Sequence, residues 1–360
     1  MAELRRNPLT RKWITYTPQN LDPETLRARL DRIRVRNHIY TDDLGICPYC
    51  PDSPEGVTEI AAMVGRDIRY TRRAAIGNGW DIRVIAAQEP IFRIEDDLRR
   101  KGQRLYDTMG SPGAHEVVIM SPRHGVAPWA LDADAWTSSL IMLRERMADL
   151  DRDERLGHPY AYLGYGQNLS FTHNHSTMNL VVSPFISEKV QKELSGAHEW
   201  FKMKERCLFC DIYEEELRKR EQGRPHGIIA ENSDYIAFIP FFAGHPFEIW
   251  VQPVEHVSCF MDIPKVTLSG LGHLIRGVLD RLFRLLGPFP LLMALMNRPN
   301  PKWGASRGYW DMIRDDWHWR IRILPDVHLE DDHARSFFHA TGTRVNPVIP
   351  ELASECLRAF

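Results

Sequence analysis

The feature that most constrains the fold is a pair of C-x-x-C motifs 160 residues apart. A single C-x-x-C can be a redox dithiol, half of a zinc site or an accident of composition. Because zinc needs further ligands from elsewhere in the chain, two such motifs predict a repeated unit that supplies those ligands twice. The motifs are Cys47 and Cys50 in GICPYCPDSP and Cys207 and Cys210 in ERCLFCDIY, while Cys259 and Cys356 stand alone.

Other parts of the sequence recur in the same order after each C-x-x-C motif. HEVVIMSPRH and FEIWVQPVEH each combine a Glu, an apolar run, a Pro and a His. THNHSTMNLVVSP and WHWRIRILP each open with a His before a strand that ends at a proline. The order predicts two tetrahedral Cys2His2 zinc sites, one formed by Cys47, Cys50, His124 and His173 and the other by Cys207, Cys210, His256 and His318.

The stretch HNHST contains two histidines, His173 and His175, separated by one residue. Alternate residues of a strand point to the same face, so both imidazoles are expected to enter one site. A single histidine beside a strand end is more often a surface or core residue than a ligand. The parallel placement of all four ligand types in both halves favours metal sites over that reading and over a redox role.

Composition excludes several classes of function. The 360-residue chain has 43% hydrophobic residues, and Lys+Arg 46 against Asp+Glu 48 gives a formal net charge of -2. This balance predicts neither an extended nucleic-acid groove nor binding to an anionic membrane surface. The N-terminus MAELRRNPLTRKW has no apolar signal core, and LLGPFPLLMALM is short and broken by prolines. A cytoplasmic protein is therefore expected.

Hydrophobic periodicity predicts an α+β fold in two halves, 1–186 and 187–360. Runs of strands followed by helices favour antiparallel sheets with flanking helices. Helices are expected at 22–35, 131–151, 187–204, 211–221, 264–286 and 350–359, and strands at 81–86, 116–121, 159–165, 176–183, 227–230, 235–240, 247–252, 291–296 and 318–324.

Motifs along nearly the whole chain carry a family resemblance. CPYCP, WDIRVIA, HEVVIMSPRH, the H-x-H strand, ENSDYIAFIPF, PFEIWVQPVEH, HWRIRILP and GTRVNPVIPE occur in this order. Together they resemble the galactose-1-phosphate uridylyltransferase family of the histidine-triad superfamily, whose relatives include ADP-glucose phosphorylase. The resemblance implies two histidine-triad-like repeats, a nucleotide-sugar substrate and a homodimer.

The resemblance also implies roles for individual residues. In the family the first His of H-x-H binds zinc and the second attacks the α-phosphorus of the nucleotide, which gives His173 to the metal and His175 to catalysis. Ser170 corresponds to a serine that contacts phosphate, and the backbone around Asn168 is expected to stabilise transition-state charge. Ser176 and Thr177 follow the predicted nucleophile, with Thr177 where the family has a phosphate-binding Gln.

The second half departs from the family pattern after His318. Arg320 and Arg322 stand where some relatives have iron-binding residues, and Met296 stands where those relatives have another His. Iron is therefore not expected. The two arginines share a strand face, where they either grip a carboxylate or phosphate of the substrate or lie in solvent.

The leading hypothesis is transfer of a nucleoside monophosphate through His175, from a nucleotide sugar or dinucleotide to a sugar phosphate or phosphate. One alternative is a divergent enzyme with another phosphate-containing or biosynthetic substrate. Another is a non-catalytic nucleotide-binding protein. A zinc finger that binds nucleic acid is disfavoured, because no concentrated basic stripe is present.

Overall fold

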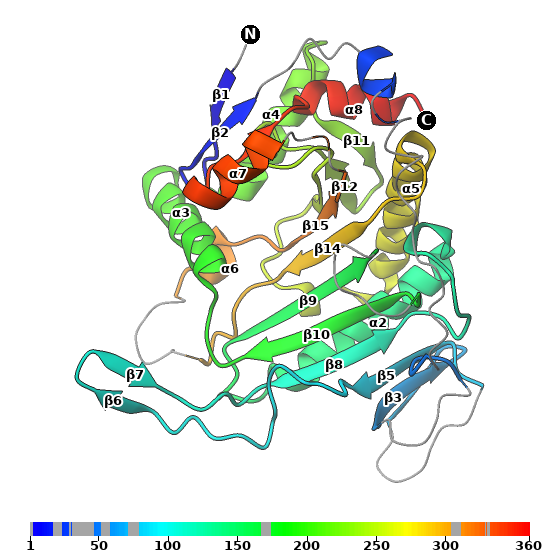
Figure 1. Cartoon of the computed structure of the whole chain (residues 1–360), viewed down its shortest axis with the longest axis vertical. Helices are drawn as coiled ribbons and strands as arrows, with labels where there is room; N and C mark the ends of the chain where they lie inside the picture. Colours follow the sequence, from blue (N-terminus) through cyan, green and yellow to red (C-terminus); the bar gives the residue numbers. More distant parts are fainter. Residues whose placement is uncertain are drawn as a thin grey trace.

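A computed structural model describes residues 3–16, 24–28, 30, 47–51, 58–70, 79–166, 174–303, 311–327, 329 and 332–360. Its centre is an eleven-stranded sheet in the order β11-β12-β13-β15-β14-β9-β10-β8-β5-β3-β4, in which all adjacent strands are antiparallel (Figure 1). The strands of this sheet are β3 (Glu59–Val64), β4 (Asp67–Tyr70), β5 (Ile82–Ala86), β8 (Ala114–Ile119), β9 (His158–Tyr165), β10 (Thr177–Ser183), β11 (Ile228–Glu231), β12 (Tyr235–Phe238), β13 (Ile249–Pro253), β14 (Leu291–Met296) and β15 (Arg320–Pro325).

Two smaller sheets lie outside the main one. One has the order β1-β2-β16, and the other is the hairpin β6-β7. Their strands are β1 (Glu3–Arg6), β2 (Trp13–Tyr16), β16 (Val345–Asn346), β6 (Lys101–Gln103) and β7 (Tyr106–Thr108). The helices are α2 (Ala133–Leu150), α3 (Glu188–Lys204), α4 (Leu208–Glu221), α5 (Leu268–Leu286), α6 (Ile313–Asp316), α7 (Asp332–Thr341) and α8 (Pro350–Arg358), with 3-10 turns at Pro128–Ala130, Phe260–Asp262 and Lys265–Thr267.

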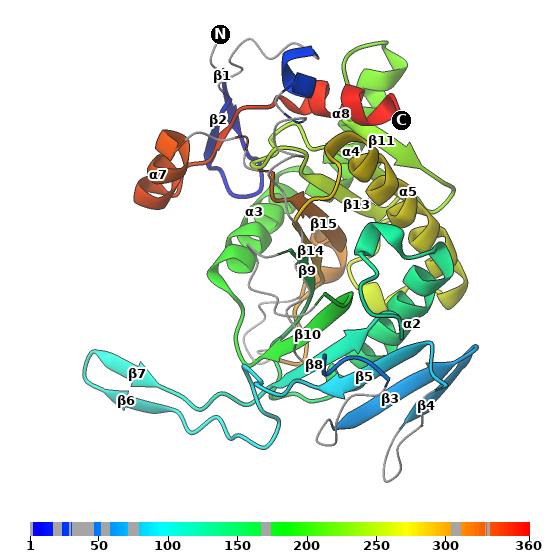
Figure 2. The same ribbon diagram turned by 45° about the vertical axis from the view of Figure 1, so that its right-hand side comes forward.

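Helices α2 and α5 cover one face of the main sheet and contact each other (Figure 2). Alternate side chains of β10, those of Met178, Leu180 and Val182, belong to the hydrophobic core beneath these helices. The intervening residues of β10, Thr177 and Asn179 among them, therefore face the opposite side. The apolar stripe of α5 is buried in this core, and its removal from water stabilises the fold.

The opposite face is covered differently in the two halves. Over the second half, α3 and α4 enclose a separate core that includes Phe209, Phe238, Trp250 and Trp317. Over the first half, residues around Trp80 and Val117 form a smaller apolar cluster with Tyr49 beside it. Tyr49 lies between Cys47 and Cys50, so the first C-x-x-C motif lies on this face.

The predicted α+β class with antiparallel strands and flanking helices is confirmed. The strands of the first half stay together in the sheet and meet those of the second half where β9 pairs with β14. The domain boundary at 186/187 and the histidine-triad relationship stay predictions. Of the helix predicted at 22–35, residues 24–28 and 30 are described and are helical, and the rest lies outside the described residues. No helix in the described part is long and apolar enough to span a membrane.

Candidate functional site

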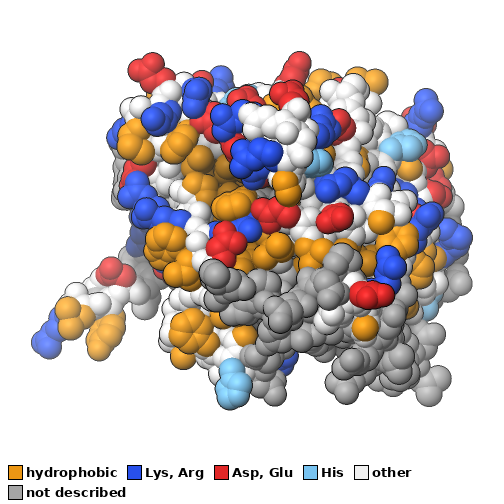
Figure 3. Space-filling model, turned by 90° about the horizontal axis from the view of Figure 1, so that it is seen from above, with side chains coloured by type: hydrophobic (Ala, Val, Ile, Leu, Met, Phe, Trp, Pro, Cys, Tyr) orange, Lys and Arg blue, Asp and Glu red, His pale blue; other side chains and the backbone are white. Residues whose placement is uncertain are grey.

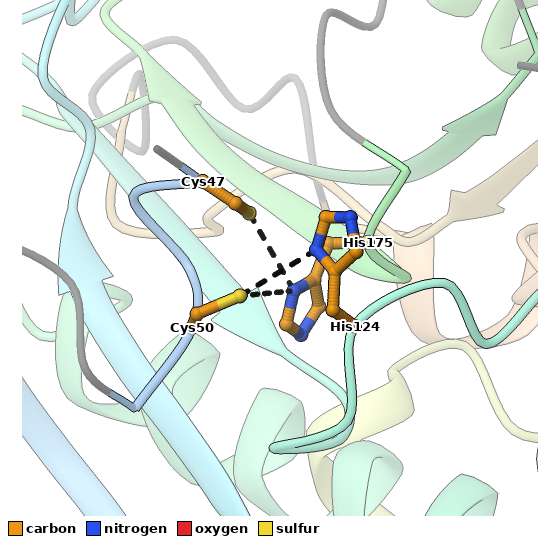
Figure 4. A group of neighbouring side chains, drawn as sticks. All are labelled: Cys47, Cys50, His124 and His175. Atoms are coloured by element: carbon orange, nitrogen blue, oxygen red, sulfur yellow. Dashed lines mark hydrogen bonds between the residues drawn. The ribbon is translucent and has the colours of Figure 1, made fainter. Parts of the chain in front are cut away.

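Four side chains from distant parts of the first half converge on one point (Figure 4). Cys47, Cys50, His124 and His175 each offer a ligand atom, and these atoms all lie within 4.8 Å of one another. The Nδ1 atom of His175 lies 3.7 Å from Cys47 Sγ, and that of His124 lies 3.5 Å from Cys50 Sγ. Tetrahedral zinc with ordinary bond lengths places sulfur and nitrogen ligands about 3.6 Å apart, so the distances fit this ion.

The fourth member of this cluster differs from the sequence-based expectation. The structure brings His175 to the cysteines, whereas the motif order predicts His173 in that place, and His173 lies outside the described residues. His175 Nε2 donates to the carbonyl oxygen of Ser121 at 2.7 Å, which leaves Nδ1 unprotonated toward the cysteines. Such a backbone bond orients a metal-binding imidazole. The predicted role of His175 as a free nucleophile disagrees with this geometry, because both of its nitrogens are used.

A second cluster repeats the arrangement in the other half. Cys207, Cys210, His256 and His318 meet the same 4.8 Å criterion. The Nδ1 atoms of both histidines lie 3.4 Å from Cys210 Sγ, and His256 Nε2 donates to the Arg314 carbonyl oxygen at 2.8 Å. The grouping predicted from the sequence is therefore present here with the same four residues, and the two clusters match in ligand types and burial.

Cys47 in the first cluster and both thiols of the second cluster have shifted pKa values. Burial raises the pKa of Cys47 to about 11. In the second cluster, the hydrogen bond with Cys210 lowers the pKa of Cys207, and the same contact raises the pKa of Cys210. Because a metal ion binds thiolates, it must displace thiol protons, so a metal ion at these clusters would be held less tightly as the pH falls.

Beside the first cluster, the sheet face opposite α2 carries Thr177 and Asn179, two and four residues after His175. Asn179 Oδ1 accepts a hydrogen bond from His115 Nε2 at 3.1 Å. His115 Nδ1 in turn accepts from the backbone N–H of Ile91 at 3.3 Å, which fixes the ring tautomer. Burial lowers the pKa of His115, so its ring is neutral at pH 7. The Asn179 amide N–H2 is thus turned away from His115, where it can donate to another group.

The sequence does not single out Asn179 and His115, whose contacts only the structure shows. The signal was available in the strand periodicity, since Asn179 shares a strand face with His175.

Arg320 and Arg322 lie inside the protein rather than in solvent. Arg322 donates from Nη2 to Glu248 Oε1 at 2.7 Å, and Arg320 donates to Glu193 of α3. The Arg320 guanidinium also lies 4.5 Å from the ring centroid of Trp250. This face of the second half is therefore filled by internal ion pairs, and substrate binding by these arginines stays a prediction without geometric support.

Three other predicted residues have no demonstrated contact with a substrate site. Ser176 is buried and donates from Oγ to the Val126 carbonyl oxygen at 2.6 Å, so its hydroxyl serves the local fold. Asn168 and Ser170 lie outside the described residues.

Comparison with known proteins shows similarity along the whole chain. No family model matches it. ADP-glucose phosphorylase of Arabidopsis thaliana is 23% identical over 359 residues, covering 99% of this chain and 92% of the relative. Galactose-1-phosphate uridylyltransferase of Thermotoga maritima is 22% identical over 361 residues, covering 99% and 98%.

Solved structures agree with these relatives. The crystal structure of ADP-glucose phosphorylase from Arabidopsis thaliana with bound ADP-glucose superposes with a TM-score of 0.75 at 23% identity, covering 100% of this chain and 99% of that one. The chain has the fold of these proteins. A uridylyltransferase structure gives a TM-score of 0.71 at 20% identity, covering 100% and 98%. The resemblance inferred from the motifs is thereby confirmed.

Proposed function

We propose that this protein is a nucleotidyltransferase that moves a nucleoside monophosphate group from a nucleotide sugar to phosphate or to a sugar phosphate. End-to-end similarity to ADP-glucose phosphorylase and to uridylyltransferases supports the reaction class. The observation that carries the proposal is the first Cys2His2 cluster. It lies beside the sheet face that carries Thr177 and Asn179, whose polar side chains are suited to phosphate oxygens.

Zinc is the proposed ion in both clusters. The cysteine and histidine donors, their spacing and the backbone-bonded imidazoles fit zinc. With four protein ligands each site is closed to substrate, so zinc would stabilise the fold and hold the start of β10. The chemistry of transfer then falls to the protein's own residues beside it.

The nucleotidyl group is proposed to pass directly from donor to acceptor. The imidazoles of His175 and His115 each use both nitrogens within the protein. An oxygen of the acceptor phosphate brings its electron pair to the α-phosphorus, and the bond from that phosphorus to the bridging oxygen breaks. The sugar phosphate leaves with the electron pair. With phosphate as the acceptor the product is a nucleoside diphosphate, and with a sugar phosphate it is a new nucleotide sugar.

Asn179 is the proposed donor to the α-phosphoryl oxygens. Its amide is oriented by His115 and needs no reorganisation to present N–H groups, which is the condition for effective stabilisation of charge. Loss of one such donor costs roughly 10²-fold in kcat. Thr177, on the same strand face, is proposed to line the same site.

Turnover and covalent labelling test the reaction separately. The protein is incubated with ADP-glucose or UDP-glucose and either phosphate or galactose 1-phosphate, and the sugar 1-phosphate released is measured. Absence of turnover with all four combinations refutes the reaction class. The Asn179→Asp variant should lose activity while keeping its metal. The control Arg152→Gln, at an exposed site, should keep its activity.

A nucleotide sugar labelled with ³²P at the α-phosphorus distinguishes the two routes. Direct transfer predicts turnover without labelled protein after denaturation. Acid-labile label on the chain during turnover contradicts the direct route and supports a covalent histidine intermediate, which a His173→Ala variant would then locate. A homodimer is also proposed, as in the sequence analysis.

A further inference from the structure

Lys189 of α3 is a cation without an ion pair among the residues that the structure describes. It lies in the first turn of the helix, where the macrodipole disfavours a positive charge, and Ser187 gives this end no side-chain cap. Residues four apart share a face of a helix, and Glu193, four residues after Lys189, binds Arg320 of β15. Lys189 therefore faces β15 as well, and the charge of Arg322, followed by burial, lowers its pKa to about 8.

His245 lies close to the same arginine. Its neighbour Gly244 donates from N to Glu248 Oε2 at 3.0 Å, and Arg322 donates from Nη2 to Oε1 of this carboxylate at 2.7 Å. The His245 ring is half-buried and has no hydrogen-bond partner in the described part of the chain. Burial, and to a lesser extent the charge of Arg344, lowers its pKa to about 4, so the ring is neutral at pH 7 and carries one N–H donor.

Arg344 lies next to this group. A Cβ built on Gly244 would be 3.6 Å from Arg344 Cγ, and the Arg344 guanidinium lies 3.5 Å from the ring centroid of Phe338. We call Lys189, His245 and Arg322 the basic cluster, with Arg344 at its border.

Positive charge and hydrogen-bond donors are in excess at the basic cluster. Within the described residues, three cations, Lys189, Arg320 and Arg322, meet two carboxylates. Glu193 and Glu248 are already bound to the two arginines, which leaves the Lys189 ammonium unpaired. Arg320 is fully buried, and its Nε and Nη1 also have no hydrogen-bond partner there.

This excess is a local property of the cluster. The chain as a whole has a formal net charge of -2. In the space-filling view from above, Lys and Arg side chains lie among Asp, Glu and hydrophobic ones (Figure 3). An anion is therefore attracted by the cluster itself, and the positive end of α3 adds to this attraction.

The basic cluster is separate from the proposed transfer site. In the register of the sheet Arg322 pairs with Ala294. Ala294 pairs with Tyr162, which pairs with Asn179. Three strand spacings thus separate Arg322 from Asn179, a distance of about 14 Å. The two sites share a face of the sheet but cannot hold the same phosphoryl group.

We propose that the basic cluster binds a second ligand through a phosphate dianion, either inorganic phosphate or a phosphate monoester. Lys189 Nζ and the His245 ring N–H each donate to a phosphate oxygen. Arg322, held in place by Glu248, supplies a fixed positive charge. The inference goes beyond the proposed transfer and does not depend on it, since its test measures occupancy of the cluster rather than turnover.

Acetylation of lysines at pH 8 tests the site directly. An amine with a pKa of about 8 is partly unprotonated at this pH, so Lys189 reacts readily with the acetyl ester of N-hydroxysuccinimide. Inorganic phosphate and glycerol 1-phosphate, added separately to the unchanged protein, should protect it. A bound dianion keeps the ammonium protonated and should slow its acetylation at least about 5-fold. Lys192, exposed on the same helix, should react at an unchanged rate.

Mass spectrometry of the digested protein measures both rates, with sodium chloride at matched ionic strength as the reference. Protection at a lower concentration of inorganic phosphate assigns the site to the free ion, and protection at a lower concentration of the ester assigns it to a monoester. The absence of protection by both would overturn the proposal. Equal slowing at Lys189 and Lys192 would overturn it too, because it would show a general effect of salt.

Variants separate the cluster from the transfer site. His245→Phe removes a donor and should weaken the protection of Lys189 by about 10-fold in phosphate concentration. Asn179→Asp, which alters the proposed transfer site, should leave this protection unchanged. Circular dichroism and metal content confirm that both variants fold. Loss of protection in Asn179→Asp, or full protection in His245→Phe, would contradict a separate site formed by the cluster.

Discussion

Arg322→Met should destabilise the protein strongly, because it leaves the Glu248 carboxylate buried without its main partner. Arg322 donates to Glu248 Oε1 from Nε at 3.1 Å and from Nη2 at 2.7 Å, and the side chains are 10% and 4% exposed. Trp250 Nε1 and Gly244 N also donate to this carboxylate, at 3.0 Å each. Breaking one side of a buried pair typically costs 3–5 kcal/mol, roughly.

The pKa of Glu248 reflects the same interaction with Arg322. Burial by itself raises this pKa, but Arg322 and then His245 outweigh burial and bring it to about 2, from an ordinary value of 4.5. A depression of this size corresponds to about 3 kcal/mol of stability. Since the folded pKa is lowered, the contribution is fully present above about pH 4.5 and is lost as the pH falls toward 2.

Urea unfolding followed by tryptophan fluorescence measures the effect. The free energy of unfolding of Arg322→Met should fall by about 3–5 kcal/mol at pH 7, and the difference from the unchanged protein should shrink below about pH 4.5. A matched control, Arg11→Met, removes an exposed pair with Glu199 and should cost under about 1 kcal/mol. A loss at Arg322 no larger than that of the control, or a loss independent of pH, would refute the reasoning.

Three further predictions concern stability and metal. In urea unfolding, Gly196→Ala should destabilise the protein by about 1–3 kcal/mol, because the new Cβ would lie 1.8 Å from the Leu9 carbonyl oxygen. Gly277→Ala, whose new Cβ would meet nothing within 4 Å, should stabilise it by about 0.5–1 kcal/mol. Burial lowers the pKa of His158 to about 4 from 6.5, so as the pH falls the unfolded chain takes up this proton first, and about 3 kcal/mol of stability is lost between pH 6.5 and 4. His158→Gln should flatten the dependence of the unfolding free energy on pH in this range. An unchanged dependence would exclude His158 as its source. Cys207→Ser should reduce zinc from about two to about one per chain in elemental analysis, and retention of both ions would contradict the second cluster as a zinc site.

Much of the fold could be predicted from the sequence because its periodicity is local. Strand β10 was expected at 176–183 and is observed at Thr177–Ser183, and α2 was expected at 131–151 and is observed at Ala133–Leu150. The short β1, β2 and β16 were not predicted, since strands of two to four residues show little periodicity. Their pairing brings together residues more than 300 positions apart, which no local pattern reports.

The sequence by itself determined seven of the eight residues in the two Cys/His clusters, because ligand chemistry is carried by residue type and the motifs recur in the same order. Strand alternation could place His173 and His175 on one face, but it could not say which of them meets the cysteines. That choice depends on where β10 begins relative to Cys47 and to the Ser121 carbonyl oxygen. Similarly, only the tertiary structure gave Arg320 its partner Glu193, since ion pairs form between groups that are near in space, whatever their separation along the chain.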